Sequence, residues 1–212
     1  MNILHWSPRS PYVRKVMVAI HEKGLLDSIE TVRTLADPMF PPRDFFATNP
    51  LAKIPTLERD GASPIWDSRV ILEWADLSSE SGPRLFPVDP ETRLQALTDE
   101  ALGTGMLETG MALLIERHMR AADRQDARVF DVCAAKFGAC LDYLEANAAR
   151  LAARDFDAGH LSIGVALCYL DFRFGDLQWR EGRPGLAAWH DGFAARPSVL
   201  ATTFRDDPRP TE

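Results

Sequence analysis

Residues 49–57 read NPLAKIPTL, and residues 66–68 read WDS. Pro55 enters a short apolar strand, where a proline is tolerated only at the strand's start or edge, or as a cis bond in a tight turn. If the Ile54–Pro55 bond is cis, the N–H and C=O of Ile54 point away from the sheet and can pair with an extended peptide. The second stretch opens an apolar-periodic helix, whose free N–H groups and positive dipole end suit a carboxylate. A small peptide with a free carboxylate would fit both features.

The composition is that of an acidic globular protein. The 212 residues are 46% hydrophobic and suffice for one large domain or two small ones. The net charge of −7 argues against nucleic acid or an anionic membrane as the main partner. No apolar run of about 18 residues is present, so we expect no membrane span. The N-terminus also lacks the basic and apolar segments of a secretory signal.

Cysteine and histidine usage favours neither disulfides nor a metal. Cys133 and Cys140 lie two turns apart on one predicted helix, about 10 Å by helical rise, which is too far for a disulfide. We expect these two and Cys168 to be small buried apolar residues, which indicates a reducing, cytoplasmic setting. No two of the five histidines have metal-ligand spacing, so we expect no metal site.

The first 78 residues predict the order βαβ, loop, ββα. Pro11 suits the first turn of a helix that Gly24 caps, and the crossover makes the flanking strands parallel. Asp60 and Gly61 supply a hairpin turn, and Pro64 makes the last strand an edge strand. The expected strands lie at residues 2–6, 29–32, 54–58 and 64–66, with a loop at 36–46 and a helix from residue 68. This order is that of thioredoxin-like domains.

The second half predicts helices only. Serine, glycine and proline residues at 79–89 indicate a linker, which separates a first domain at residues 1–78 from an all-helical domain at 90–212. The expected helices lie at residues 90–119 and 127–151, from near 162, and at 185–195. Gly103, Gly105 and Gly110 interrupt the first of them, each at a cost of about 1 kcal/mol relative to alanine. They would allow a kink or leave space beside a ligand.

The order and spacing of these motifs resemble those of the glutathione transferases. The matching stretches are residues 7–16, 49–57, 67–68, 184–189 and 195–198, so the resemblance covers nearly the whole chain. It implies a bacterial, serine-type member with an α/β thioredoxin-like N-terminal domain and an all-α C-terminal helical bundle. The family also implies glutathione as co-substrate, a cytoplasmic homodimer and a role in detoxification.

Two serines are candidates for activating the glutathione thiol. A free thiol has a pKa of about 8.5, which a helix N-terminus or hydrogen-bond donors lower. Ser10 precedes the first helix, where it can stabilise a thiolate or simply cap the helix, and the resemblance favours the thiolate role. Ser7, at the end of the first strand, is the rival, because some classes of the family place the active hydroxyl there. The first domain has no cysteine, which disfavours thiol–disulfide exchange.

Five further residues are expected to bind glutathione. Lys53 and Ile54 resemble the family's pair before the cis-proline, with Ile54 acting through its backbone and Pro55 holding the turn. Asp67 and Ser68 resemble the acidic-plus-hydroxyl pair that takes the γ-glutamyl end. The acid would meet the α-amino group, and Ser68 and the helix start would meet the carboxylate. Asp67 can cap the helix at the same time.

One motif departs from the family's pattern. The family carries a capping box of the form Ser/Thr-x-x-Asp late in the chain, and here Ser162 keeps the cap while Val165 replaces the aspartate. We expect the lost reciprocal bond to cost about 1 kcal/mol at this helix start.

The sequence therefore predicts a glutathione transferase that activates the glutathione thiol for attack on a small apolar electrophile, which the helical domain helps to bind. A binding or regulatory protein that keeps the fold without turnover is the alternative. The retained Lys53, Asp67 and Ser68 argue against it, because a protein that does not bind glutathione has no physical reason to keep such a pocket.

Overall fold

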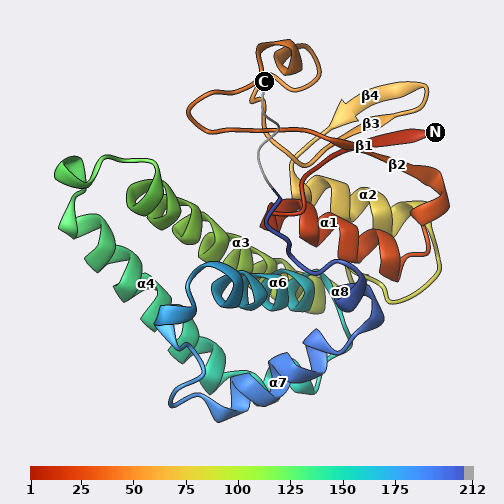
Figure 1. Ribbon diagram of the computed structural model, residues 1–212. Helices are drawn as coiled ribbons and strands as arrows, with labels where there is room; N and C mark the ends of the chain where they lie inside the picture. The colour runs from red at the N-terminus through yellow and green to blue at the C-terminus, as the bar shows by residue number, and fades with distance from the viewer. Residues whose placement is uncertain (208–212) are drawn as a thin grey trace. The chain divides into compact units, whose positions relative to one another are not determined.

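The computed structural model describes residues 1–207, which form two compact units (Figure 1). The first unit contains Met1–Pro87 together with the described residues from Pro197 on, and the second contains Val88–Arg196. Among residues 1–207, no helix has the length and apolar character needed to cross a membrane.

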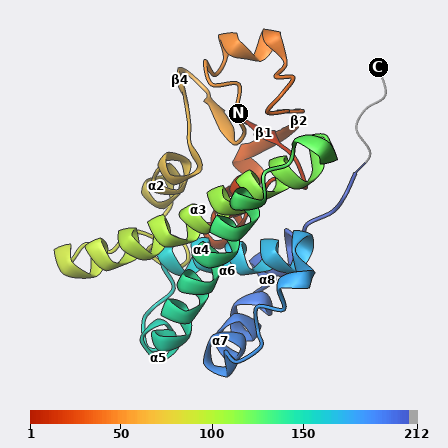
Figure 2. The ribbon, with the colours of Figure 1, turned by 90° about the vertical axis from the view of Figure 1, so that its left-hand side faces the viewer.

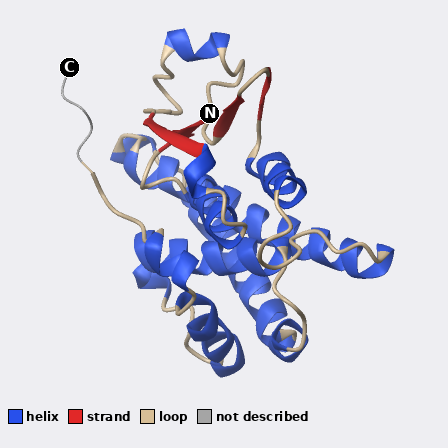
Figure 3. Cartoon of the chain, turned by 90° about the vertical axis from the view of Figure 1, so that its right-hand side faces the viewer, coloured by secondary structure: helices blue, strands red, loops and turns tan. Residues whose placement is uncertain are grey.

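A four-stranded mixed sheet organises the first unit, as the sequence predicts (Figure 3). The strands stand in the order β2-β1-β3-β4, with β1 parallel to β2 and antiparallel to β3, and with β4 as an edge strand. Their bounds are β1 Asn2–Trp6, β2 Ile29–Arg33, β3 Thr56–Arg59 and β4 Ala62–Ile65. The thioredoxin-like βαβ–ββα order is confirmed.

Two helices pack against each other on one side of this sheet (Figure 1). They are α1 (Pro11–Glu22) and α2 (Ser68–Ser78), and short 3-10 turns lie at η1 (Leu26–Ser28) and η2 (Arg43–Ala47). The apolar face of each helix forms the core of the unit with the central strands. Fully buried members of this core are Leu4, Val16, Ile20, Leu57, Ile71 and Leu72.

The segment after α2 is tied back to the first unit, which differs from a linker over residues 79–89. Asp76 forms a buried ion pair with Lys23, with 3.1 Å between Oδ1 and Nζ, and accepts backbone N–H groups from Leu85 and Phe86. Leu85 and Phe86 are themselves buried. The first unit therefore extends to Pro87, because a buried carboxylate and two apolar side chains fix this segment.

The residues after the helical unit also return to the first unit, whereas the sequence placed them in the helical domain. Helix α8 (Pro197–Ala201) packs on α1. The Val199 carbonyl accepts a hydrogen bond from Arg14 Nη2 at 3.1 Å, and the Ser198 hydroxyl donates to Glu22. Both contacts join residues more than 170 positions apart. The periodicity of apolar residues along the sequence cannot reveal contacts over such a separation.

The second unit is helical throughout its described structure (Figure 2). Helix α6 lies at its centre, with every residue from 158 to 167 buried, and packs along α3. The helices are α3 Pro90–His118, α4 Ala127–Ala146, α5 Ala148–Ala152, α6 Ala158–Arg173 and α7 Pro184–Ala194, with 3-10 turns η3 Ala122–Arg124 and η4 Gly175–Leu177. Asn147 divides the predicted helix at residues 127–151 into α4 and α5.

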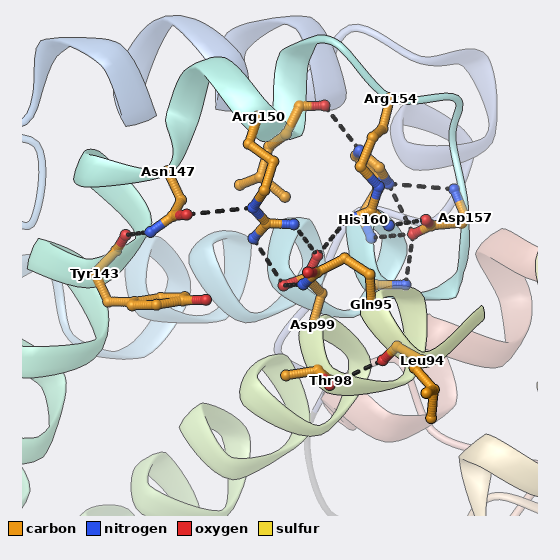
Figure 4. Close-up of polar contacts among 12 residues, drawn as sticks. Leu94, Gln95, Thr98, Asp99, Tyr143, Asn147, Arg150, Arg154, Asp157 and His160 are labelled. Atoms are coloured by element: carbon orange, nitrogen blue, oxygen red, sulfur yellow. Dashed lines mark hydrogen bonds and ion pairs between the residues drawn. The ribbon is translucent and has the colours of Figure 1, made fainter. Parts of the chain in front are cut away.

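Helix α6 begins earlier than the sequence motif predicts. Its N-cap is Asp157, which forms a reciprocal capping box with His160. Figure 4 shows the same region, where Arg154 contacts both Asp157 and the buried Asp99. Ser162 is therefore inside the helix, and the expected loss of a capping bond at Val165 is wrong.

Candidate functional site

The three predicted segments lie at the same end of the strands of the sheet. They are the serine loop (residues 7–10), the proline loop (residues 53–55) and the acid turn (residues 67–68). The serine loop follows the end of β1. Because β1 is antiparallel to β3, this loop lies at the end of the sheet where β3 begins. The proline loop precedes β3, and the acid turn follows β4, which ends at this same end of the sheet. All seven predicted site residues therefore share one end of the sheet.

A buried asparagine fixes the proline loop. Asn49 is fully buried, and its Nδ2 donates to the Lys53 carbonyl at 3.0 Å and to Thr56 Oγ1 at 2.8 Å. Its Oδ1 accepts the Leu51 N–H at 2.9 Å, and the Thr56 hydroxyl donates to the Lys53 carbonyl. These bonds close the loop from both sides and leave its outer surface available to a ligand.

The proline loop has backbone hydrogen-bonding groups that are available to a ligand. The Ile54–Pro55 peptide bond is cis. Among residues 1–207, neither the N–H nor the C=O of Ile54 has a hydrogen-bond partner. The Lys53 side chain is exposed and forms no ion pair within the same residues. This loop can thus pair with an extended backbone and present a cation beside it.

The acid turn forms the start of α2. Asp67 is the N-cap, and its Oδ1 accepts the Arg69 N–H at 3.0 Å. The Asp67 side chain is exposed, whereas Ser68 is 2% exposed. The N–H groups of Ser68 and Val70 have no acceptor within the described part of the chain. A helix start of this kind can hold a carboxylate, while the second Asp67 oxygen can meet an amine.

Both candidate serines lie where β1 turns into α1. Ser10 is the N-cap of α1, and its Oγ accepts the Val13 N–H at 3.3 Å. Ser7 is 8% exposed, and its Oγ accepts the Arg9 N–H at 3.4 Å. A hydroxyl that accepts one bond still has its own proton to donate. Either serine can therefore donate to a thiolate.

A cavity opens beside Ser7 within the first unit. Its volume is about 330 Å³. The apolar side chains of Trp6, Met17 and Leu200 line it together with the polar groups of Thr202 and Arg205. A small molecule with an apolar body and a polar end fits this lining.

Some contacts of this region were not visible in the sequence. Asn49 belongs to a matched motif, but its hydrogen bonds depend on a loop closure that only the structure shows. Arg9 and Arg33 meet Asp207, which lies far along the chain. No spacing of residues within a local stretch of sequence could have indicated these ion pairs. Within the described residues, no cluster of three or more His, Cys, Asp or Glu side chains is arranged to hold a metal ion.

Comparison with known proteins gives a consistent set of similarities. Residues 9–77 match the family model described as glutathione S-transferase, N-terminal domain. A glutathione transferase family member from Pseudomonas fluorescens Pf-5, solved with bound glutathione, is 38% identical, with a TM-score of 0.92 over 97% of this chain and 100% of its own. A second structure from the same organism holds S-(propanoic acid)-glutathione, with 38% identity, a TM-score of 0.89 and the same coverage. The uncharacterized GST-like protein YibF of Escherichia coli (strain K12) is 28% identical over 91% of this chain and 94% of its own.

Proposed function

This chain belongs to the glutathione S-transferase family, and we propose that it binds glutathione at the sheet edge and activates its thiol for attack on a small electrophile. The observation that carries the proposal is the convergence of the serine loop, the proline loop and the acid turn at one end of the sheet. The glutathione bound to the similar Pseudomonas fluorescens protein supports it.

The γ-glutamyl end of glutathione is assigned to the acid turn. Its α-carboxylate meets the Ser68 hydroxyl and the free N–H groups at the start of α2, where the helix dipole favours negative charge. Its α-amino group meets the exposed carboxylate of Asp67, whose other oxygen caps the helix. A charge-assisted bond of this kind contributes about 1.5–3 kcal/mol.

The central part of glutathione is assigned to the proline loop. Ile54 pairs its N–H and C=O with the cysteinyl residue of the ligand, in the manner of an added strand. Lys53 adds a positive charge on the exposed side, and the hydrogen bonds of Asn49 keep the loop in register. The thiol then lies toward the serine loop, where the hydroxyl of Ser10 or Ser7 donates to the thiolate and lowers its pKa.

The electrophile is assigned to the cavity beside Ser7. The S-(propanoic acid)-glutathione held by the similar Pseudomonas fluorescens protein carries a short substituent on sulfur, which supports a small electrophile. Trp6, Met17 and Leu200 offer an apolar wall for it. The proposal further includes a contribution of the helical domain to this site, a cytoplasmic homodimer and a role in detoxification, in keeping with the family.

Calorimetric titration with glutathione tests the proposal. We expect the wild type to bind with micromolar to millimolar affinity and Asp67→Ala to bind about ten- to a hundredfold more weakly, because the ligand's ammonium loses its partner. Glu80→Ala serves as the control, because Glu80 is exposed just after α2 and away from the acid turn. Equal affinity in the wild type and Asp67→Ala would reject the assigned site.

An electrophile panel then separates a transferase from a binding protein of the same fold. Turnover of any electrophile that depends on glutathione and falls in Asp67→Ala supports the transferase. Tight glutathione binding without turnover across conjugation, isomerisation, dehalogenation and peroxide substrates would instead support the binding role. Absence of glutathione binding in the wild type would overturn both.

A further inference from the structure

We propose that Asp207 is a positioning residue, which holds the serine loop in place through Arg9 and Arg33. The inference rests on the proposed role of this loop in activating glutathione. It concerns the C-terminal strap, which we define as residues 203–207. Neither the family motifs nor the matched N-terminal domain at residues 9–77 include this segment.

Asp207 forms ion pairs with two arginines on different elements. Its carboxylate accepts hydrogen bonds from Arg33 Nε at 2.8 Å and Arg33 Nη2 at 3.2 Å, which is a bidentate contact. Its Oδ1 also lies 3.0 Å from Arg9 Nε. The side chains of the two arginines are 25% and 29% exposed, so they are partly shielded from water. The hydrogen bond from the Arg33 guanidinium is the main cause that lowers the pKa of the Asp207 carboxyl below its ordinary value.

The rest of the strap fastens the same loop. The Arg205 N–H donates to the Pro8 carbonyl at 3.2 Å. Phe204 is 8% exposed and lies under the Arg14 guanidinium, whose carbon is 4.4 Å from the ring centroid. The strap thus contacts the serine loop through the Arg205 backbone and through Asp207, and it contacts the first turn of α1 through Phe204.

Besides the strap, the serine loop is held by its own hydrogen bonds and by the start of α1, where Ser10 caps the helix. Within the loop, Ser10 N–H donates to the Ser7 carbonyl at 3.2 Å and Arg9 N–H donates to the Ser7 hydroxyl at 3.4 Å. Arg33 ends β2, and it is paired in register with Trp6, the residue before the loop. Asp207 therefore joins the serine loop to the end of β2. Without its charge, Arg33 loses its bidentate carboxylate and Arg9 keeps the more distant Asp206, so the loop is held less firmly to β2.

The test compares Asp207→Asn with the wild type in the full-length protein. We expect hydrogen exchange of the backbone amides at residues 9, 10, 12 and 13 to become faster in the ligand-free variant. We expect the pKa of the bound glutathione thiol, followed by thiolate ultraviolet absorbance, to rise. We also expect kcat/KM to fall about tenfold, mainly through kcat, because the hydroxyl donors are misplaced.

Two further variants serve as controls. Asp206→Asn removes a neighbouring charge, 63% exposed, whose nearest oxygen is 3.5 Å from Arg9, and we expect less than about a twofold change in kcat/KM. Asp207→Glu keeps the charge and should restore most of the thiol pKa and of kcat. A purely structural role would lower the melting temperature without changing the thiol pKa, and that outcome would overturn the proposal.

The measurements on the wild type and on Asp207→Asn also distinguish failure of this inference from failure of the proposed function. If the wild type fails to bind glutathione, the proposed function is rejected, and the positioning role is rejected with it. If the wild type binds glutathione but Asp207→Asn leaves the exchange rates, the thiol pKa and kcat unchanged, only the role of Asp207 is rejected.

Discussion

Ser7 and Ser10 differ in their surroundings although both can donate to a thiolate. Ser10 caps α1, so its hydroxyl lies at the positive end of that helix dipole. Ser7 is buried beside the cavity that we assign to the electrophile. The residue next to the helix start has the stronger electrostatic basis for lowering a thiol pKa, because the dipole adds to the hydrogen bond.

We therefore predict that Ser10→Ala lowers kcat by about a hundredfold, and that Ser7→Ala lowers it less. Steady-state kinetics and the pKa of the bound thiol measure both effects. Ser10→Ala also removes a helix cap, at about 1 kcal/mol of stability. Ser10→Gly is the matched control, because glycine at an N-cap costs only a few tenths of a kcal/mol and still lacks the hydroxyl. Recovery of kcat in Ser10→Gly would show that capping, and not the hydroxyl, matters.

Asn49 is predicted to support glutathione binding indirectly. Asn49→Ala removes three hydrogen bonds from a fully buried position and leaves the Lys53 carbonyl and the Leu51 N–H with fewer partners. We expect a loss of about 3 kcal/mol in the free energy of unfolding and a higher KM for glutathione. Urea unfolding and initial-rate kinetics measure these effects. An unchanged KM in a folded variant would contradict the positioning of Ile54 by this loop.

At the scale of elements, the three glycines of α3 have different surroundings. A Cβ at Gly103 would lie 2.4 Å from the Ser162 carbonyl carbon, so glycine is required where α3 meets α6. A Cβ at Gly105 would have no neighbour within 4 Å. At Gly110, the nearest neighbour would be the Phe174 ring at 3.3 Å. Close helix packing, and not a kink, explains the first of these glycines.

Gly103→Ala and Gly105→Ala are therefore predicted to change stability in opposite directions. The first forces α6 backbone away from α3 and should destabilise the protein by about 3 kcal/mol. The second removes glycine flexibility from an open helical position and should stabilise it by about 1 kcal/mol. Urea denaturation of the two variants beside the wild type provides the test. A stable Gly103→Ala variant would show that the two helices can separate at little cost.

The α6 cap gives a second prediction at this scale. Asp157 is 2% exposed and accepts the N–H groups of Gly159 and His160 at 2.9 and 3.0 Å. Asp157→Ala leaves these donors buried without partners and should cost about 3 kcal/mol. Asp157→Ser keeps a capping oxygen and should recover at least half of that loss. Asp89→Ala, at the exposed cap of α3, is the control, and we expect it to destabilise the protein less than Asp157→Ala does, because water can satisfy the freed donors.

The sequence predicted the elements of the first unit closely, because short apolar runs and turn residues determine them locally. The strand at residues 2–6 and the helix from Pro11 agree with the structure. The start of α6 was missed, because its cap is an aspartate followed by histidine, which the family's motif does not include. The break at Asn147 was missed because the apolar pattern continues through it into α5.

At the scale of the whole chain, long-range contacts limited what the sequence could predict. The sequence predicts the βαβ unit and the hairpin, but the pairing of β1 with β3, which brings the seven candidate site residues to one end of the sheet, is seen only in the structure. The return of α8 and the strap to the first unit could not be predicted. It depends on pairs such as Arg33 with Asp207, which are 174 positions apart. Such pairs carry no periodic signal, since each is a single charge among many on the surface.

The second unit contains a buried histidine with a lowered pKa. His190 is 2% exposed, its ring meets Trp179 edge-on, and its Nε2 lies 3.4 Å from Cys168 Sγ. Burial is the main cause that lowers its pKa to about 4 from the ordinary 6.5. Among the charged groups around it, Asp171 and Asp191 raise the pKa and Arg180 lowers it.

His190 is predicted to destabilise the protein between pH 7 and pH 5. Because the folded pKa lies below the unfolded one, the unfolded chain binds the proton first, and stability falls as the pH drops through 6.5 toward 4. We expect the wild type to lose about 2 kcal/mol more than His190→Gln over this interval. Urea unfolding at pH 7, 6 and 5 measures the two slopes, and parallel slopes for the wild type and His190→Gln would contradict the assignment.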